Sequence, residues 1–259
     1  MNQILQAENL NKRFGAVVAA ADINISVSSG EIVAIIGANG AGKTTFVNMV
    51  TGYLKPSSGT VRFMGEDITG RTPRQVCRSG LSRSFQVAQL FPDLTVLENM
   101  MVAAAALRLS AASFFRPLDR QASRQAALEL LDNFDIADFS EVPASILSQG
   151  ARKLLDISMA LISSPSMLLL DEPTSGVAVD EKFPLMETVM KGIRQAGATV
   201  MFIEHDMEIV SHYASRVIAF YEGGIIADGD VKSVLADERV RKYIVGQVQQ
   251  SAIAEASND

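Results

Sequence analysis

The chain has 259 residues, 48% of them apolar, which is enough to bury the core of one large domain. Its formal net charge of −6 disfavours a broad nucleic-acid surface, because such a surface needs clustered Lys and Arg side chains. The single cysteine, Cys77, excludes an internal disulfide and a metal site built from several thiolates.

The hydropathy of the chain predicts no membrane insertion. The first residues contain no basic segment followed by a long apolar stretch, so we expect no secretory signal. The longest apolar stretch, residues 100–107, is far shorter than the roughly 20 residues that cross a bilayer. We therefore expect a protein that stays in the cytoplasm.

Residues 3–30 have the pattern of short strands joined by turns. Polar and apolar residues alternate over 22–27, which is typical of a strand with one buried face. This region therefore predicts a half-buried antiparallel sheet.

A glycine-rich loop comes next. Residues 37–45, Gly-Ala-Asn-Gly-Ala-Gly-Lys-Thr-Thr, follow an apolar run at 32–36 and precede a helix-like segment. This order of strand, glycine loop and helix is typical of the phosphate-binding loop of nucleoside triphosphatases, although an ordinary glycine turn is the alternative. The glycines let backbone N–H groups point inward, and the helix adds its positive N-terminal end. The residues expected to bind nucleotide are Gly37, Asn39, Gly40, Ala41, Gly42, Lys43, Thr44 and Thr45.

Two side chains of this loop carry specific chemistry. Lys43 is expected to reach the β- and γ-phosphates as a point charge, and the Thr44 hydroxyl is expected to ligate magnesium. The loop therefore predicts binding of ATP or GTP.

A helical region with two polar sites follows. Gln86 lies at the junction between the core and this region, where its side chain could contact both a metal-bound water and a movable lobe. Residues 94–164 have Ala, Leu, Arg and Gln at helical spacing. Ser148 is a good N-cap for a helix at 152–162, whose free N–H groups form a second anion site. Such a site, far along the chain from the first loop, would serve a nucleotide held by a partner molecule.

Two buried strands are predicted to end in functional side chains. The run at 167–170 is followed by Asp171 and Glu172, and the run at 199–203 is followed closely by His205. Because ligands bind at the carboxyl ends of parallel strands, Asp171 is expected to hold magnesium and Glu172 to act as general base. His205 is expected to meet the γ-phosphate end of the site. The alternatives to these catalytic roles are a solvated Asp-Glu loop and a structural histidine.

The last part of the chain predicts two short strands and a helix. The strands are expected at 217–220 and 224–227, and the helix at about 231–245. The polar, alanine-rich tail at 247–259 is expected to fray.

These motifs, in this order, resemble those of the ATP-binding cassette family over about residues 5–246. The resemblance rests on Walker A at 37–45, the Gln86 loop, the signature at 147–151, Walker B at 167–172 and the switch residue His205. It implies an α/β fold with a P-loop NTPase (RecA-like) core, an antiparallel β subdomain and an inserted α-helical subdomain.

The resemblance also implies a division of the chain. A single ATPase domain would occupy 1–246, with its core at 1–86 and 165–246 and its helical subdomain at 87–164, followed by a flexible tail at 247–259.

The family's mechanism supplies further expectations. It implies an ATPase that uses ATP and Mg²⁺, with the metal at Thr44, Gln86 and Asp171 and with Glu172, His205 and Gln86 as catalytic residues. Family members work as head-to-tail dimers, in which Ser148 and Gly150 would contact the ATP of the opposite subunit. Phe14 stands where the family stacks adenine, although a core phenylalanine is the alternative.

The implied partners are those of a membrane transporter. They are transmembrane permease subunits, a second ATPase subunit in a homodimer or heterodimer and, indirectly, a periplasmic or extracellular binding protein; no nucleic acid is expected. The chain would lie peripherally at the cytoplasmic face of the inner or plasma membrane.

Within the family, the segment 85–99 and the insert around 114–117 look most like the ATPases of importers for branched-chain amino acids, urea and amides. Lipopolysaccharide-export cassettes share parts of this pattern. Three rival functions stay open at this point: an exporter cassette, a soluble ABC ATPase of translation or DNA maintenance, and a small-molecule kinase, which would lack the signature.

Four residues depart from the family pattern. Gln149 and Ala151 replace the commoner Gly and Gln of the signature, and Ala178 replaces an Asp or Asn that touches the opposite subunit. The last change puts communication between the two sites in doubt and favours an unequal pair of subunits. Met159 replaces a frequent arginine and has no interpretation.

Overall fold

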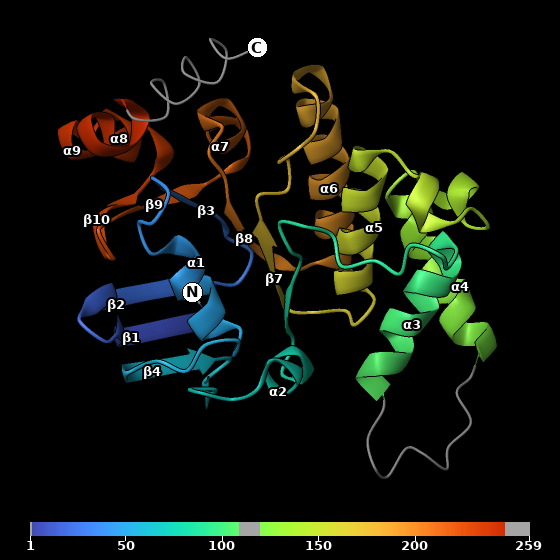
Figure 1. The fold of residues 1–259 in the computed structure, drawn as a ribbon, viewed down its shortest axis with the longest axis horizontal. Helices are drawn as coiled ribbons and strands as arrows, with labels where there is room; N and C mark the ends of the chain where they lie inside the picture. Colours follow the sequence, from blue (N-terminus) through green and yellow to red (C-terminus); the bar gives the residue numbers. More distant parts are fainter. Residues whose placement is uncertain (1, 109–119, 247–259) are drawn as a thin grey trace. The chain divides into compact units, whose positions relative to one another are not determined.

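The computed structural model describes residues 2–108 and 120–246. The chain divides into two compact units, one made of Met1–Val76 with Val200–Asp259 and the other of Cys77–Thr199 (Figure 1). The insert around 114–117 and the tail at 247–259 lie outside the described residues. The subdomain boundaries expected from the sequence stay a prediction.

The first unit contains an antiparallel sheet of four strands in the order β2-β1-β4-β5. Leu5 of β1 stands opposite Val27 of β2 on one side and Phe63 of β4 on the other, and all three side chains are buried. The half-buried antiparallel sheet expected from the alternating pattern is therefore confirmed. The strands are β1 (Gln3–Phe14), β2 (Val17–Ser28), β4 (Ser58–Phe63) and β5 (Glu66–Asp67).

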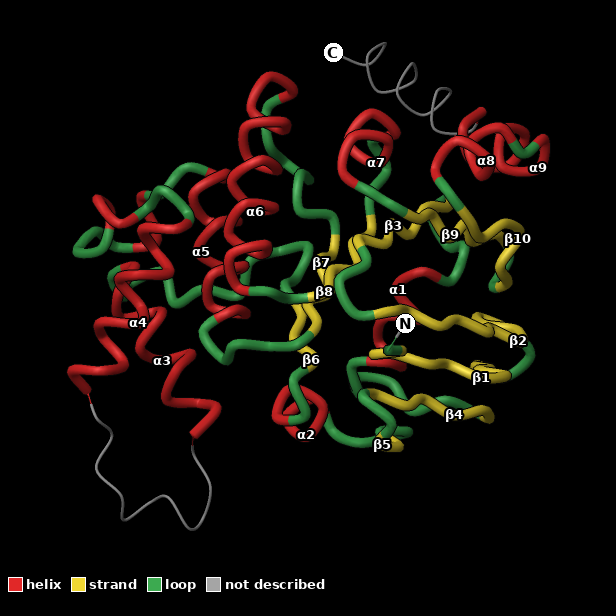
Figure 2. Tube along the Cα trace, turned by 180° about the vertical axis from the view of Figure 1, so that it is seen from behind, coloured by secondary structure: helices red, strands yellow, loops and turns green. Residues whose placement is uncertain are grey.

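A second, mostly parallel set of strands completes this unit. β3 (Ile32–Gly37) pairs in parallel with β8 (Thr199–Ile203) and β9 (Arg216–Tyr221), and β9 pairs antiparallel with β10 (Gly224–Gly229). Helix α1 (Lys43–Val50) lies between the two sets of strands in Figures 1 and 2. Its buried Phe46 ring lies 5.7 Å from the Phe220 ring of β9, centroid to centroid, which joins the helix to the core.

The C-terminal helix expected at 231–245 is broken, so that expectation is wrong in detail. The structure has α8 (Val231–Ala236), α9 (Glu238–Val240) and a π-helical turn (Arg241–Val245). The side chain of Asp237 accepts a hydrogen bond from the N–H of Arg239, and this cap starts a new helix. Helix α7 (Met207–Tyr213) also belongs to this unit.

The second unit pairs two parallel strands, β6 (Leu81–Arg83) and β7 (Met167–Asp171), with a group of helices (Figure 2). β7 is buried along its whole length, as its apolar run predicts. The helices are α3 (Val96–Arg108), α4 (Arg120–Asn133), α5 (Gln149–Leu161) and α6 (Lys182–Ala196), with short 3-10 turns at Ala137–Phe139, Ala144–Ile146 and Val179–Glu181. Helix α2 (Pro73–Arg78) spans the boundary between the two units.

Within residues 2–108 and 120–246, no helix is both long enough and apolar enough to cross a membrane.

Candidate active site

The glycine loop joins β3 to α1 in a conformation that depends on two glycines. Gly37 has φ +154°, and a Cβ atom there would lie 2.5 Å from the carbonyl oxygen of Phe220. Gly42 has φ +101°, and a Cβ atom there would lie 2.8 Å from the carbonyl oxygen of Ala19. Any larger residue at either position would force the backbone apart, so the close fit of the loop requires glycine.

Lys43 folds over this loop. Its buried ammonium donates to the carbonyl oxygens of Gly37, at 2.6 Å, and Ala38, at 2.9 Å. The first turn of α1 contains no acidic side chain, so the positive end of the helix is not neutralised locally. A lysine, inward-curving backbone and a bare helix N-terminus together suit a triphosphate. Asn39, Gly40 and Thr44 are exposed here, Thr45 is half-buried and Ala41 is buried.

His205 follows the strand next to the glycine loop. The N–H of Glu204 donates to the carbonyl of Ile35, 3.3 Å away, which carries the parallel pairing of β8 and β3 to their carboxyl ends. His205 therefore stands at the same edge of the strands as the loop. Its backbone N–H donates to the carboxylate of Glu204, at 3.0 Å.

Phe14, at the end of β1, is 52% exposed. The possibility of a core phenylalanine is therefore excluded. The Lys12 ammonium lies 5.1 Å from the centroid of the Phe14 ring, within the range of a cation–π interaction.

In the second unit, Asp171 ends β7 and forms a buried ion pair. Its Oδ2 lies 2.5 Å from Nη2 of Arg83, the last residue of the neighbouring strand β6, and both side chains are more than nine-tenths buried. Arg83 was not predicted from the sequence. No local sequence signal marks it, because β6 has only three residues and Arg83 and Asp171 are 88 residues apart in the chain.

Glu172 and Gln86 are in direct contact. The Gln86 side-chain amide donates to Oε2 of Glu172 at 2.7 Å, so two residues predicted to be catalytic from distant parts of the sequence meet. Glu172 has φ +49°, a left-handed conformation that is uncommon for a residue with a side chain and concentrates at functional sites.

Two further residues of this region were not predicted. Lys153 donates from its ammonium to the carbonyls of Gln86 and, at 3.2 Å, Glu172. The carboxylate of Asp156 accepts from backbone N–H groups of the Gln86 loop. Burial raises the pKa of Asp156, while these N–H donors and the charge of Lys153 oppose that shift. A Lys and an Asp three residues apart on a largely apolar helix face could have indicated a buried pair, although not its partners elsewhere in the chain.

The N-cap expected at Ser148 is confirmed. Its side-chain oxygen accepts from the N–H of Ala151, at 3.3 Å, and Ser148 is exposed at the start of α5. Gln149, one of the departures from the family pattern, lies beside Gly176, where a Cβ atom would come 3.4 Å from the Gln149 amide nitrogen. The signature loop and the segment after Walker B are therefore in contact within this unit.

The predicted magnesium ligands are divided between the units. Thr44 belongs to the first unit, whereas Gln86 and Asp171 belong to the second, so this set stays a prediction. Across the described residues, no group of three or more His, Cys, Asp or Glu side chains is arranged to hold a metal. Mg²⁺ bound with substrate phosphates needs only one or two protein carboxylates, and the oxygen donors expected here suit it.

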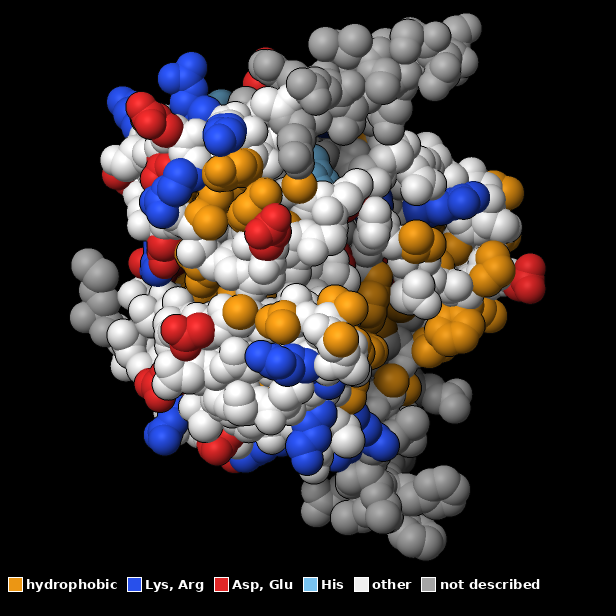
Figure 3. Space-filling view, turned by 60° about the vertical axis from the view of Figure 1, so that its left-hand side comes forward, with side chains coloured by type: hydrophobic (Ala, Val, Ile, Leu, Met, Phe, Trp, Pro, Cys, Tyr) orange, Lys and Arg blue, Asp and Glu red, His pale blue; other side chains and the backbone are white. Residues whose placement is uncertain are grey.

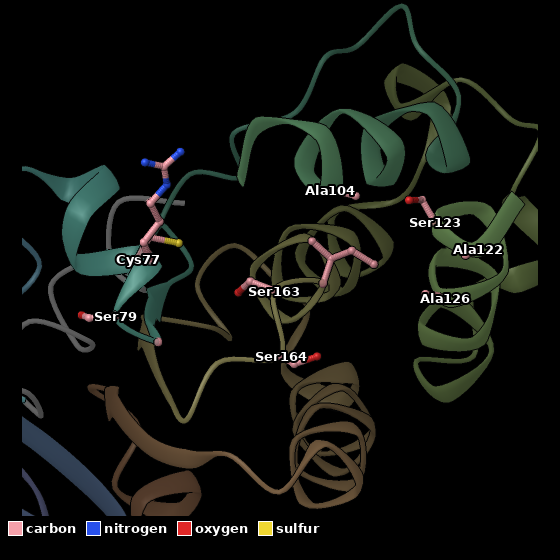
Figure 4. A pocket seen from close by; sticks show the side chains of 11 residues that line it. Cys77, Ser79, Ala104, Ala122, Ser123, Ala126, Ser163 and Ser164 are labelled. Atoms are coloured by element: carbon pink, nitrogen blue, oxygen red, sulfur yellow. The ribbon is translucent and has the colours of Figure 1, made fainter. Parts of the chain in front are cut away.

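A pocket of about 550 Å³ lies elsewhere in the second unit (Figure 4). Its lining comes from the end of α2, from α3 and α4, and from the turn after α5, and it includes Cys77, Ala104, Ser123 and Ser163. None of the predicted site residues lines this pocket.

The profile of the ABC transporter family matches residues 20–175, more than half of the chain. The chain belongs to the ABC transporter family. The kinase possibility is therefore wrong, and the ABC cassette fold, with its P-loop core, antiparallel sheet and helical portion, is confirmed.

Named relatives agree with the family assignment. This ABC cassette is 32% identical to the probable branched-chain amino acid transport ATP-binding protein LivG of Methanocaldococcus jannaschii, over 95% of the chain and 98% of that protein. It is also 32% identical to the high-affinity branched-chain amino acid transport ATP-binding protein BraF of Pseudomonas aeruginosa, over 94% of the chain and 98% of that protein.

A solved structure matches along the same length. The ADP conformation of MJ1267, an ATP-binding cassette of an ABC transporter, superposes with a TM-score of 0.84 at 32% identity and covers 95% of this chain and 100% of that one. The chain is thus the ATP-binding cassette of an ABC transporter, an ATPase that hydrolyses ATP.

Proposed function

We propose that this cassette powers the import of branched-chain amino acids. The support for the substrate is the transport named for relatives that are 32% identical over almost the whole chain. The cassette would bind peripherally at the cytoplasmic face of the membrane, to permease subunits that receive substrate from a periplasmic or extracellular binding protein. Urea and amides are the related substrates to test beside branched-chain amino acids.

Nucleotide binding is assigned to the first unit. The Lys43 ammonium and the backbone N–H groups of the loop would hold the β- and γ-phosphates, and the exposed Phe14 ring would stack on adenine. Thr44, Gln86 and Asp171 would hold Mg²⁺, which when bound supplies positive charge to offset that of the phosphates.

Hydrolysis is assigned to Glu172 as general base. The observation that carries this assignment is the 2.7 Å hydrogen bond from Gln86 to Glu172, which orients the carboxylate. Glu172 would accept a proton from the attacking water, and His205 would contact the γ-phosphate end of the nucleotide. For this role the carboxylate must be ionised and must lie within hydrogen-bond reach of the attacking water.

Two cassettes would close around two nucleotides. The exposed N-terminus of α5, with Ser148 and Gly150, offers N–H groups to an anion held by the opposite subunit. The mate is an identical or a related chain, and Ala178 favours an unequal pair.

The permease would contact the segment that follows Gln86. Val87 is 71% exposed and Phe91 is exposed too, and apolar side chains of this size at a surface favour an interface. On the face of the molecule in Figure 3, exposed apolar side chains lie among interspersed acidic and basic ones.

The test is transport in proteoliposomes that contain the cassette, its permease and its binding protein. We expect ATP-dependent uptake of leucine, and a Glu172→Gln variant that binds ATP as the wild type does but turns over about 10² to 10⁴ times more slowly. Wild-type hydrolysis by this variant would refute the base assignment. Co-purification with ribosomes or DNA in place of membranes would refute the transport role.

A further inference from the structure

The buried face of α5 carries two charged side chains. Lys153 is 2% exposed and Asp156 is 6% exposed, and they stand among the buried apolar residues Leu155 and Ile157. A spacing of three places both on the same side of the helix. Charged groups are rarely buried unless strong hydrogen bonds hold them, so their partners indicate what this face is built to fix.

Asp156 accepts hydrogen bonds from both ends of the Gln86 loop, residues 85–89. One carboxylate oxygen accepts from the N–H of Phe85, at 3.1 Å, and the other accepts from the N–H of Gln89, at 3.0 Å. Between these two points, the Lys153 ammonium donates to the carbonyl of Gln86 itself. Three backbone groups in five residues are therefore tied to one helix.

The same ammonium also reaches the catalytic base. Lys153 donates to the carbonyl of Glu172, at 3.2 Å, while the side chain of Gln86 donates to the carboxylate of Glu172, at 2.7 Å. Lys153 therefore hydrogen-bonds to the backbones of Gln86 and Glu172, the two residues whose side chains bond to each other. A shift of α5 would displace them together.

The N-terminus of α5 carries the signature. Ser148 caps the helix five residues before Lys153, a distance of about 7.5 Å along a straight helix. The helix has 13 residues and packs against α3, α4 and α6, so it moves as a rigid element on this length scale. The anion site at Ser148 and the side chains of Lys153 and Asp156 that bind the Gln86 loop therefore belong to a single rigid element.

We propose that Lys153 and Asp156 are positioning residues, through which contact between the signature and the opposite subunit's nucleotide sets the geometry of Gln86 and Glu172 in this chain. The inference rests on the proposed function, because it requires a nucleotide presented by a second cassette. Under this proposal, the position of Glu172 in each subunit depends on the nucleotide held by the other subunit. It also gives a physical route for communication between the sites that does not pass through Ala178.

The experiment compares full-length wild type with Lys153→Met, which keeps all but the last atom of the side chain's length and removes its donors. Amide hydrogen exchange at residues 85–89 is measured with and without a non-hydrolysable ATP analogue and Mg²⁺. We expect the analogue to slow this exchange in the wild type and to leave it unchanged in Lys153→Met. Analogue affinity should stay within about twofold, because Lys153 lies outside the phosphate loop.

Kinetics provide the second readout. Lys153→Met should lower kcat about 10- to 100-fold at unchanged KM, as expected for a misplaced catalytic group, and Lys153→Arg should restore most of it. Lys191→Met, at an exposed position of α6, is the matched control and should behave as the wild type. If Lys153→Met does not fold, Asp156→Asn tests the same loss of response through the Phe85 and Gln89 amides.

The outcomes distinguish a failure of this inference from a failure of the proposed function. If the wild type binds the analogue and dimerises while Lys153→Met keeps the exchange response and kcat, the inference is wrong and the function stands. A variant that only melts at a lower temperature, with both readouts intact, would show a purely structural role. A wild type that binds no analogue, or binds it without dimerising, would overturn the proposed function and this inference with it.

Discussion

At the residue scale, the glycine loop itself holds the Lys43 ammonium. Its two hydrogen bonds to the carbonyl oxygens of Gly37 and Ala38 fix its position in the loop. A fixed charge loses little conformational entropy when the nucleotide arrives. Lys43 should therefore dominate nucleotide affinity.

We expect Lys43→Ala to weaken ATP binding about 100-fold or more, because a charge-assisted hydrogen bond to phosphate is lost. Titration with a fluorescent ATP analogue measures this change. Lys232→Ala removes an exposed lysine from α8 and serves as the control, with unchanged affinity. Undiminished binding by Lys43→Ala would contradict the role of the loop.

The Arg83–Asp171 pair gives Asp171 a second role, in stability. Asp171→Asn should lower the free energy of unfolding by about 3 kcal/mol even in EDTA, because a buried guanidinium then loses its anionic partner. Urea unfolding without metal or nucleotide measures this loss. Asp138→Asn, at an exposed position, should change the free energy by less than about 0.5 kcal/mol. Equal stability of Asp171→Asn and wild type would mean that the ion pair contributes nothing.

At the element scale, helices of the second unit approach closely at one glycine. A Cβ atom on Gly192 of α6 would lie 2.5 Å from the ring of Phe134, which follows α4 and is fully buried. The contact fixes how near α6 comes to this ring.

Gly192→Ala should therefore destabilise the protein by about 1–2 kcal/mol. The cost of overpacking, about 2–3 kcal/mol, outweighs the gain of up to about 1 kcal/mol from the higher helix propensity of alanine. Thermal and urea unfolding measure the difference, with the exposed Lys191→Ala as the neighbouring control. A more stable Gly192→Ala protein would show that the ring moves aside freely.

The same scale explains what the sequence could and could not predict. β7 and β8 were predicted because apolar runs that end in Asp171-Glu172 and near His205 are local signals. β6, with three residues, is too short to give a periodic pattern, so its Arg83 was missed. Lys153 was missed because its partners lie 67 and 19 residues away, and only the folded chain brings them together.

At the scale of the whole molecule, the proposed function requires more than one chain. The nucleotide-binding loop and the signature helix belong to different compact units of this protein. In the proposed dimer, the loop of one copy and the signature of the other bind the same triphosphate, whose negative charge attracts both. Dimer formation should therefore depend on ATP, and the dimer should dissociate after hydrolysis.

The most direct measurement is nucleotide-dependent cross-linking of Asn39→Cys to Gln149→Cys, one exposed position in the loop and one in the signature. The background carries Cys77→Ser, so that no native thiol reacts, and Glu172→Gln, so that ATP persists. With ATP, a short bismaleimide should join two copies into a covalent dimer, and Lys43→Ala in the same background should abolish the product. A dimer that forms equally without ATP, or no cross-link while ATP is bound, would contradict the account.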